Sequence, residues 1–252
     1  MSTEQPHSDS PRLDRRDALL TALAGGAVAL AGSASAAQPD TRRASPRRYD
    51  MKKSINLWAF PYPGRMSFKE CLQLAKDAGF DGIELNYDLD NDLSPKSGTK
   101  EYQAIRKMAA DIGIAISGIC SFLYWPYSLT SNKPAERARG LELAGLMAQA
   151  AHDLGTENVL VVPGAVGIPW IKDAEPVAAD VCDRRAREAI GKLIPKAEKL
   201  GVYLNIENIF FNGYLLSPQD MIAFVDSFQS KHVRVHFDTG NIMLLKFQIS
   251  VL

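Results

Sequence analysis

The sequence predicts a fold of the α/β class, and two observations support this prediction. From about Ser54 onward, short apolar runs rich in β-branched residues alternate with longer segments of helical periodicity. Polar and acidic residues directly follow several of these runs, as they do where parallel strands present functional groups at their carboxyl ends. Alternation of strand and helix along one chain is typical of a parallel sheet covered by helices.

Six apolar runs predict the strands, and five segments between them predict the helices. The strands are expected over residues 55–60, 82–86, 114–119, 159–162, 202–206 and 233–237. The helices are expected over residues 68–78, 102–111, 135–154, 180–200 and 218–228. Four of these helices are followed by a glycine that can end a helix in the left-handed conformation, namely Gly79, Gly113, Gly155 and Gly201.

Two parallel architectures fit this alternation, an open doubly wound sheet and a closed barrel. No G-x-G-x-x-G motif follows the first strand, which argues against the dinucleotide-binding form of the open sheet. The acidic strand ends favour a (β/α)8 barrel of the TIM type. Only about six βα units are present over residues 54–252, so we expect an incomplete barrel with two exposed sheet edges.

Charge and cysteine content exclude several classes of protein. The 252 residues include 29 Lys and Arg against 29 Asp and Glu, a formal net charge of zero. A basic face for nucleic acid or an anionic membrane is therefore not expected. The three cysteines, Cys71, Cys120 and Cys182, form no C-x-x-C pair, which argues against a disulfide scaffold or a structural zinc site.

The first 36 residues have the order of an export signal. Arg15 and Arg16 precede an uncharged run over residues 18–31, and the small residues 34–36 offer a cleavage site at their end. The paired arginines and the Ala/Gly-rich run resemble a twin-arginine signal, with a general secretory signal or a plain tail as alternatives. We therefore expect a periplasmic protein that meets the membrane only through this signal, with a linker over residues 37–53.

Two strand ends concentrate the residues that can do chemistry. Side chains alternate along a strand, so Glu207 shares a face with Asn205, and Asp238 shares a face with His236. Glu207 and Asp238 lie one βα unit apart, and adjacent parallel strands would bring both carboxylates to one rim. Two converging carboxylates suit a hard divalent ion such as Mg²⁺ or Mn²⁺. The alternative is that each carboxylate merely caps the following helix or pairs with an arginine.

Four segments together resemble a known superfamily. They are GFDGIELN at 79–86, NVLVVPG at 158–164, GVYLNIENIFFNGYLLSP at 201–218 and HFDTGNIML at 236–244. These segments are similar to the xylose-isomerase-like TIM-barrel superfamily, and within it to sugar-phosphate isomerases and epimerases of the L-xylulose-5-phosphate 3-epimerase type.

The resemblance implies a metal site. In this superfamily Glu, Asp, His and Glu at the ends of the fifth to eighth strands hold a divalent ion. Glu207 matches the first glutamate and Asp238 the aspartate, whereas the histidine and the second glutamate would lie beyond Leu252. Glu207 is then also one of the two glutamates that move a proton next to a carbonyl. The implied cofactor is Mn²⁺ or Mg²⁺, weakly held if held at all.

Four residues are expected to contact the substrate. Glu84 matches an acidic residue common in the family, and Asn208 follows the first ligand in the IEN segment. Asn241 falls where related ketose 3-epimerases carry a substrate-contacting histidine. Trp58 could form an apolar wall for the sugar. A structural ion pair for Glu84 and barrel packing for Trp58 are the alternatives.

The implied function is metal-dependent isomerisation or epimerisation of a sugar or sugar phosphate, by a monomer or an oligomer. Because half of the family's metal ligands are missing, we expect the 252-residue chain to be inactive by itself. Two alternatives stay open. One is a non-catalytic remnant that at most binds sugar. The other is a metalloenzyme like an apurinic-site endonuclease, which a basic groove beside the carboxylates would favour.

The export signal can be tested with a reporter fused after Ala37. Replacing Arg15 and Arg16 together by lysine is expected to abolish export, because the twin-arginine receptor reads the arginine pair and lysine is not equivalent. The measurement is the periplasmic fraction of the reporter. Unchanged export of the double variant would instead indicate a general secretory signal, and no export of either form would indicate a plain tail.

Overall fold

One parallel sheet organises the part of the chain that the structure describes, residues 51–209 and 213–242 of a computed structural model. Its strands are β1 (Ser54–Asn56), β2 (Gly82–Asn86), β3 (Ala115–Cys120), β4 (Asn158–Val161), β5 (Tyr203–Glu207) and β6 (Val233–His236). Each strand pairs in parallel with the next strand along the chain. The export signal predicted for residues 1–36, and the linker up to residue 50, lie outside the described residues.

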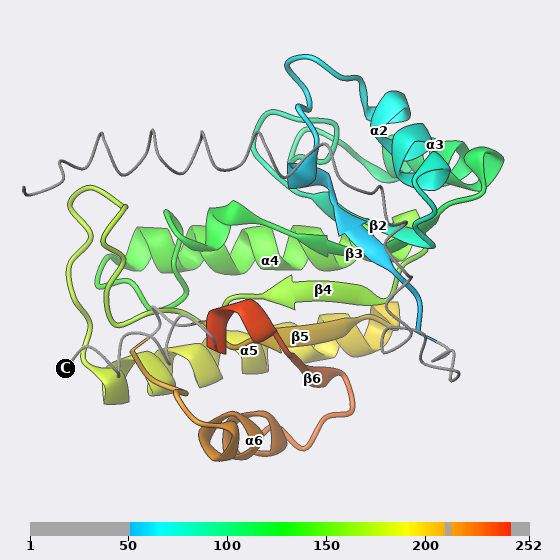
Figure 1. The fold of residues 1–252 in the computed structure, drawn as a ribbon. Helices are drawn as coiled ribbons and strands as arrows, with labels where there is room; N and C mark the ends of the chain where they lie inside the picture. The colour runs from blue at the N-terminus through cyan, green and yellow to red at the C-terminus, as the bar shows by residue number, and fades with distance from the viewer. Residues whose placement is uncertain (1–50, 210–212, 243–252) are drawn as a thin grey trace, which may run out of the picture. The chain divides into compact units, whose positions relative to one another are not determined.

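Helices connect the strands and cover one face of the sheet, as Figure 1 shows. They are α2 (Phe68–Asp77), α3 (Thr99–Ile112), α4 (Pro134–Leu154), α5 (Ala179–Leu200) and α6 (Pro218–Asp226), with short 3-10 turns η2 (Leu57–Ala59) and η3 (Phe122–Tyr124). Neighbouring helices from α2 to α5 also contact one another. The arrangement confirms the predicted α/β fold of TIM-barrel type. None of the described helices is long and apolar enough to cross a membrane.

The alternation along the strands separates a helix-facing side from a cavity-facing side. Leu204 and Ile206 of β5 are fully buried in the hydrophobic core, whereas Asn205 and Glu207, which alternate with them, are only partly buried. Burial of such side chains against the helices stabilises the sheet by roughly 25 cal/mol per Å² of apolar surface. This pattern confirms the alternation on which the predicted position of Glu207 depends.

The glycines predicted to end helices do so. At Gly201, which ends α5, φ is +68°, and its N–H donates to the carbonyl oxygens of Ala197 and Glu198. The same left-handed conformation occurs at Gly79, Gly113 and Gly155. An L-residue with a side chain would be strained there, so these positions explain why the chain turns sharply from each helix into a buried strand.

The first strand is shorter than predicted. A strand was expected over residues 55–60, but β1 ends at Asn56, whose Oδ1 accepts a hydrogen bond of 2.8 Å from the backbone N–H of Trp58. This contact caps the turn η2 and leaves the side chain of Trp58 59% exposed beside the strand end. Local hydrogen bonding by an asparagine side chain has overridden the β-propensity of the apolar run.

Two alanine substitutions within α5 test the role of its terminal glycine. Neither Gly191 nor Gly201 has an atom within 4 Å of an added Cβ, so packing does not enter the comparison. Gly201→Ala is expected to lower the free energy of unfolding by about 1 kcal/mol because of the left-handed φ. Gly191→Ala, inside the helix, is expected to raise it by about 0.5–1 kcal/mol. Urea denaturation measures both changes, and equal signs would contradict this interpretation.

Candidate functional site

A cavity of about 760 Å³ lies at the carboxyl ends of the strands. Residues at or shortly after the ends of all six strands line it, which is the position of active sites in TIM barrels. The lining combines carboxylates, amides and aromatic rings; it includes Asn56, Trp58, Glu84, Cys120, Phe122, Trp125, Trp170, Glu207, His236, Asp238 and Asn241.

The structure brings Glu207 and Asp238 together at this rim. Glu207 is the last residue of β5 and lies in register with His236 of β6, two residues before Asp238. The negative charge of Asp238 acts on the Glu207 carboxyl group, so the two side chains are close neighbours. The sequence-based expectation that both carboxylates meet at one end of the sheet is therefore met.

Burial raises the pKa of Glu207 to about 7. Desolvation is the largest cause, and the negative charges of Asp238 and Glu84 act in the same direction. The side chain of Asn241 opposes them, because its Nδ2 donates to Glu207 Oε1 over 3.4 Å. A carboxyl group that titrates near neutrality can both accept and donate a proton at physiological pH.

Asp238 also caps the helical turn that follows β6. Its Oδ1 accepts hydrogen bonds from the backbone N–H groups of Gly240 at 2.6 Å and Asn241 at 3.1 Å. The capping role considered as an alternative to metal binding is thus real for this carboxylate. The cap does not remove Asp238 from the cavity, since Asp238 lines the cavity and its charge acts on Glu207 as well.

Asn208 holds Asp238 in place. Its Oδ1 accepts a hydrogen bond of 2.7 Å from the backbone N–H of Asp238, and its Nδ2 donates to the Asp238 carbonyl oxygen over 2.8 Å. Asn208 is not among the residues that line the cavity. The side chain predicted to contact substrate is instead engaged in a two-point contact between the ends of β5 and β6.

Glu84 sits across the cavity in a cluster of neutral polar groups. Its Oε2 accepts a hydrogen bond of 2.6 Å from Asn56 Nδ2, so its partner is an amide and not the cation of an ion pair. The same Asn56 nitrogen lies 3.1 Å from Cys120 Sγ. Burial, followed by the charge of Glu84, raises the pKa of the Cys120 thiol, so Cys120 is a buried thiol and no nucleophile.

Aromatic rings form the rest of the wall, and sequence reasoning identified only Trp58 among them. Phe122 and Trp125 follow β3, and Trp170 lies in the loop after β4. The rings of Trp125 and Trp170 meet edge to face, with centroids 4.8 Å apart. A signal was present in the sequence, because Trp58 lies near the end of a predicted strand, and Trp125 and Trp170 come shortly after predicted strands.

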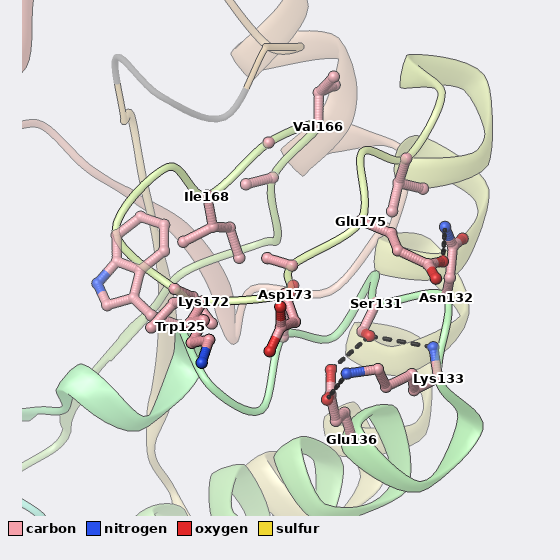
Figure 2. A pocket seen from close by; sticks show the side chains of 16 residues that line it. Trp125, Ser131, Asn132, Lys133, Glu136, Val166, Ile168, Lys172, Asp173 and Glu175 are labelled. Atoms are coloured by element: carbon pink, nitrogen blue, oxygen red, sulfur yellow. Dashed lines mark hydrogen bonds and ion pairs between the residues drawn. The ribbon is translucent and has the colours of Figure 1, made fainter.

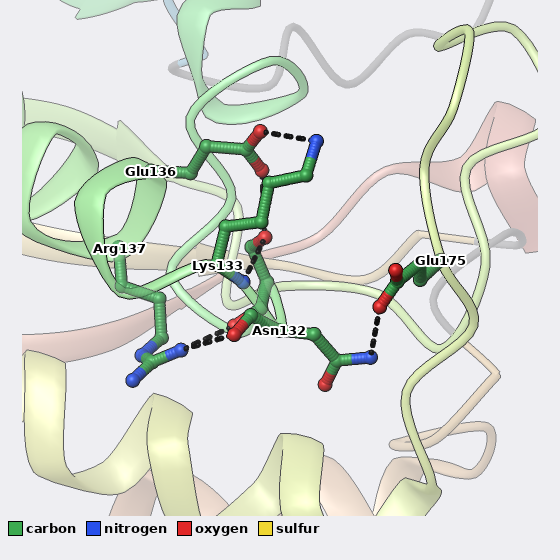
Figure 3. A network of polar contacts seen from close by, with 6 residues as sticks. Asn132, Lys133, Glu136, Arg137 and Glu175 are labelled. Carbon is green, nitrogen blue, oxygen red and sulfur yellow. Dashed lines mark hydrogen bonds and ion pairs between the residues drawn. The ribbon is translucent and has the colours of Figure 1, made fainter.

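A small hollow beside the cavity is too narrow for a sugar. It holds about 40 Å³ between the segment before α4 and the loop after β4, and Trp125 borders it (Figure 2). Polar contacts close it: Lys133 Nζ lies 3.0 Å from Glu136 Oε1, and Asn132 Nδ2 donates to Glu175 Oε2 over 3.2 Å (Figure 3). The network ties the loop that carries Trp170 to the start of α4 and is structural.

The oxygen atoms at the rim fit part of a divalent metal site. Glu207 and Asp238 offer hard carboxylate ligands of the kind that Mg²⁺ and Mn²⁺ prefer. Burial and the negative charge of Asp238 raise the pKa of Glu207, and a nearby cation would act in the opposite direction. Within residues 51–209 and 213–242, no group of three or more His, Cys, Asp or Glu side chains is placed to hold a metal ion.

Comparison with known proteins identifies the family. Residues 72–248 match the family described as "Xylose isomerase-like TIM barrel", and the chain belongs to this family. L-ribulose-5-phosphate 3-epimerase UlaE of Escherichia coli K12 is 33% identical over 190 residues, 75% of this chain and 64% of that protein. L-ribulose 3-epimerase of Mesorhizobium japonicum is 28% identical over 168 residues, 65% of this chain and 52% of that protein.

Solved structures agree on the fold. A D-psicose 3-epimerase determined in the presence of D-fructose has a TM-score of 0.65 at 24% identity, over 77% of this chain and 65% of that one. An L-ribulose 3-epimerase has a TM-score of 0.64, also at 24% identity, over 77% and 62%. The chain thus spans less than two thirds of the length of the curated relatives named above.

The raised pKa of Glu207 predicts how stability depends on pH in metal-free buffer. Between the ordinary glutamate pKa of 4.5 and about 7, the folded state keeps a proton that the unfolded state has lost. Raising the pH through this window therefore destabilises the fold, by up to about 3 kcal/mol. Glu207→Gln, which mimics the protonated form, is expected to remove this part of the pH dependence.

The measurement is the free energy of unfolding of both proteins, by urea denaturation at intervals from pH 4.5 to 8. The difference should shift steadily in favour of the glutamine variant as the pH rises. Glu157→Gln, at an exposed carboxylate outside the cavity, is the matched control and should parallel the wild type. Parallel curves for Glu207→Gln as well would contradict the raised pKa of the buried Glu207 carboxyl group.

Proposed function

We propose that this chain carries the proton-transfer half of a sugar isomerase or epimerase site, with Glu207 as the catalytic residue. The observation that carries the proposal is the position of Glu207, a partly buried carboxyl group with a pKa near 7 in a cavity at the strand ends. Membership of the xylose isomerase-like family and similarity to 3-epimerases of L-ribulose and its 5-phosphate support it.

Proton transfer at a carbon next to a carbonyl explains why Glu207 is desolvated. As the carboxylate it would take the proton from that carbon, and its raised pKa brings its basicity closer to what the step requires. As the carboxylic acid it could return the proton. The neighbouring charges of Asp238 and Glu84 strengthen the basicity of Glu207, because they disfavour a second negative charge in the same cavity.

The other residues would position the reaction. Asn208 fixes the backbone of Asp238, and Asn241 orients the Glu207 carboxyl group through its amide. Glu84, held by Asn56 through Oε2, lines the cavity and would accept a hydrogen bond from a sugar hydroxyl. Glu207 and Asp238 would hold a divalent cation, Mn²⁺ or Mg²⁺, which when bound supplies positive charge to polarise the carbonyl oxygen.

A non-catalytic sugar-binding protein is the second candidate. The observation that favours it is the limited donor set, since two carboxylates alone leave most coordination positions of a divalent ion to water. A nuclease is less well supported, because the cavity lining in the described residues holds three carboxylates and no lysine or arginine to receive a phosphodiester.

We further propose that the protein is exported to the periplasm by the signal over residues 1–36. The paired Arg15 and Arg16, the uncharged run and the Ala-Ser-Ala site support this proposal. The substrate would then be a sugar present outside the cytoplasm.

The decisive measurement is exchange of the proton next to the ketose carbonyl with deuterated water, in the presence of Mn²⁺. We expect little exchange from the 252-residue chain, whose two described metal ligands should bind Mn²⁺ weakly. Extending it with the part of UlaE that follows the matched segment is expected to yield exchange. Glu207→Gln in that extended protein should lower the rate by at least about 100-fold, the usual contribution of a general base.

Two results would count against the proposal. Exchange that survives Glu207→Gln would remove Glu207 from the reaction. Tight Mn²⁺ binding in the extended protein without exchange of any ketose would leave a binding protein. Glu157→Gln serves as the matched control, since the exposed Glu157 lies outside the cavity and its loss should leave the rate unchanged.

A further inference from the structure

A second hollow, called here the apolar groove, lies on the helix-facing side of β6. It holds about 310 Å³ between β6, α6 and the turn that follows β6. Val235 and Phe237 line the groove, whereas His236 and Asp238, which alternate with them, line the cavity on the other side of the sheet. The rest of its apolar lining includes Leu216, Met221, Ile222 and Ile242.

Exposed apolar side chains are concentrated in this groove. Half of the ten large apolar side chains that are exposed among the described residues line it, namely Leu216, Ile222, Val235, Phe237 and Ile242. Phe237 is 64% exposed and Ile222 is 55% exposed, although Val233 on the same face of β6 is buried. Apolar surface gathered in this way is typical of a binding surface, because its removal from water is favourable.

The backbone of β6 offers a free edge beside the groove. In the sheet that the structure describes, β6 is the last strand and pairs with β5 alone. The N–H and C=O groups along its other edge therefore have no partner strand among the described residues. Such an edge can accept an extended segment as an additional strand, which is held by backbone hydrogen bonds and by every second side chain.

The groove lies directly behind the carboxyl groups of the candidate site. Asn208 and Asn241 line it. Asn241 Nδ2 donates to Glu207 Oε1 and, over 2.8 Å, to the carbonyl oxygen of Asn208. Asn208 in turn holds the backbone of Asp238. A segment that fills the groove would exclude water from these amide contacts and so strengthen the hydrogen bonds that position both carboxyl groups.

The chain itself supplies a segment that fits the groove. Ile242 lines the groove, and residues 243–252, which lie outside the described residues, follow it directly. Apolar and polar residues alternate along this segment, so an extended chain carries Leu245, Phe247, Ile249 and Val251 on one face and Lys246, Gln248 and Ser250 on the other. A segment tethered this closely has an effective concentration on the order of millimolar, which favours it over a second copy of the chain at micromolar concentration.

We propose that residues 245–251 add to the free edge of β6 as an antiparallel strand, with Phe247 and Ile249 in the apolar groove. The direction follows from the length of the segment. It leaves β6 at the carboxyl end, and a parallel strand would first need a crossover of roughly a dozen residues or more, longer than residues 243–252 allow. The inference goes beyond the proposed function, since it concerns how the sheet edge is covered and stands whether or not Glu207 transfers protons.

Paired cysteine substitutions in the full chain test the strand and its orientation. Val235→Cys is combined in turn with Phe247→Cys, Gln248→Cys, Ile249→Cys or Ser250→Cys, and each protein is oxidised at micromolar concentration. The three native cysteines are buried and do not compete. We expect at least about fivefold more intrachain disulfide with the better of positions 247 and 249 than with 248 or 250, because only side chains on the groove face can approach position 235. Peptide mapping by mass spectrometry measures the yields.

A matched pair of charge substitutions gives a second measurement that does not depend on disulfide geometry. Ile249→Asp would place a charge in the apolar groove, so it is expected to release the segment and to speed hydrogen exchange of residues 233–237 at least about threefold. Ser250→Asp adds the same charge one residue further on, on the opposite face of the proposed strand, and should leave the exchange unchanged.

Several outcomes would overturn this inference. Disulfide yields that are equal at all four positions, or absent at all four, would show that the segment does not dock in the proposed way, as would equal exchange rates for the two aspartate variants. Disulfides that form between chains and disappear on dilution would instead assign the groove to a second copy. None of these measurements involves sugar or metal, so failure of the added strand and failure of the proposed function are distinguishable.

Discussion

Parallel pairing of successive strands brings the carboxyl ends of β1 to β6 to one edge of the sheet. The register of each pair then decides which side chains enter the cavity. In β5 and β6, Ile206 lies opposite Val235 and Glu207 opposite His236. A slip of one residue would turn Glu207 toward the helices and expose the fully buried Ile206, so burial of the outer face fixes the chemistry of the inner face. The same strand register is therefore required both for burial of Ile206 and for the position of Glu207 in the cavity.

This strand register has an energetic cost, because it places carboxyl groups close together and away from water. Placing Glu207 beside Asp238 and Glu84, away from water, is unfavourable unless charge is neutralised. In the metal-free chain these effects raise the pKa of Glu207 to about 7, so a proton on Glu207 provides the neutralisation below that pH. The backbone contacts of Asn208 and the helix cap by Asp238 keep the two groups together despite their repulsion. A cation at the same place would replace the proton, which couples any metal affinity of the pair to pH.

Much of this architecture could be predicted from the sequence because the strongest signals are local. The run over residues 82–86 matches β2, and the helix expected over 180–200 begins one residue earlier as α5. Alternation placed Glu207 and Asp238 on one rim. The early end of β1 was not predictable from propensity, because it depends on a hydrogen bond from the backbone of Trp58 to the Asn56 side chain.

The aromatic side chains that line the rest of the cavity could not be predicted from the sequence. Phe122, Trp125 and Trp170 lie in connections after β3 and β4, where no periodicity indicates which way a side chain points. The side chain of Asn132 is hydrogen-bonded to Glu175 and to Arg185, and these contacts hold the two connections together. The three residues are distant from one another in the sequence, so their contacts could not be predicted from it.

The carboxylates and the aromatic rings of the cavity are therefore held in place by different interactions. Strand register positions the carboxylates, and the charge of Glu207 changes with pH and with any bound cation. Loop hydrogen bonds and ring packing position the aromatic rings. These rings carry no group that gains or loses a proton near neutral pH. The charge state of Glu207 can therefore change with pH while the rings keep their positions beside it.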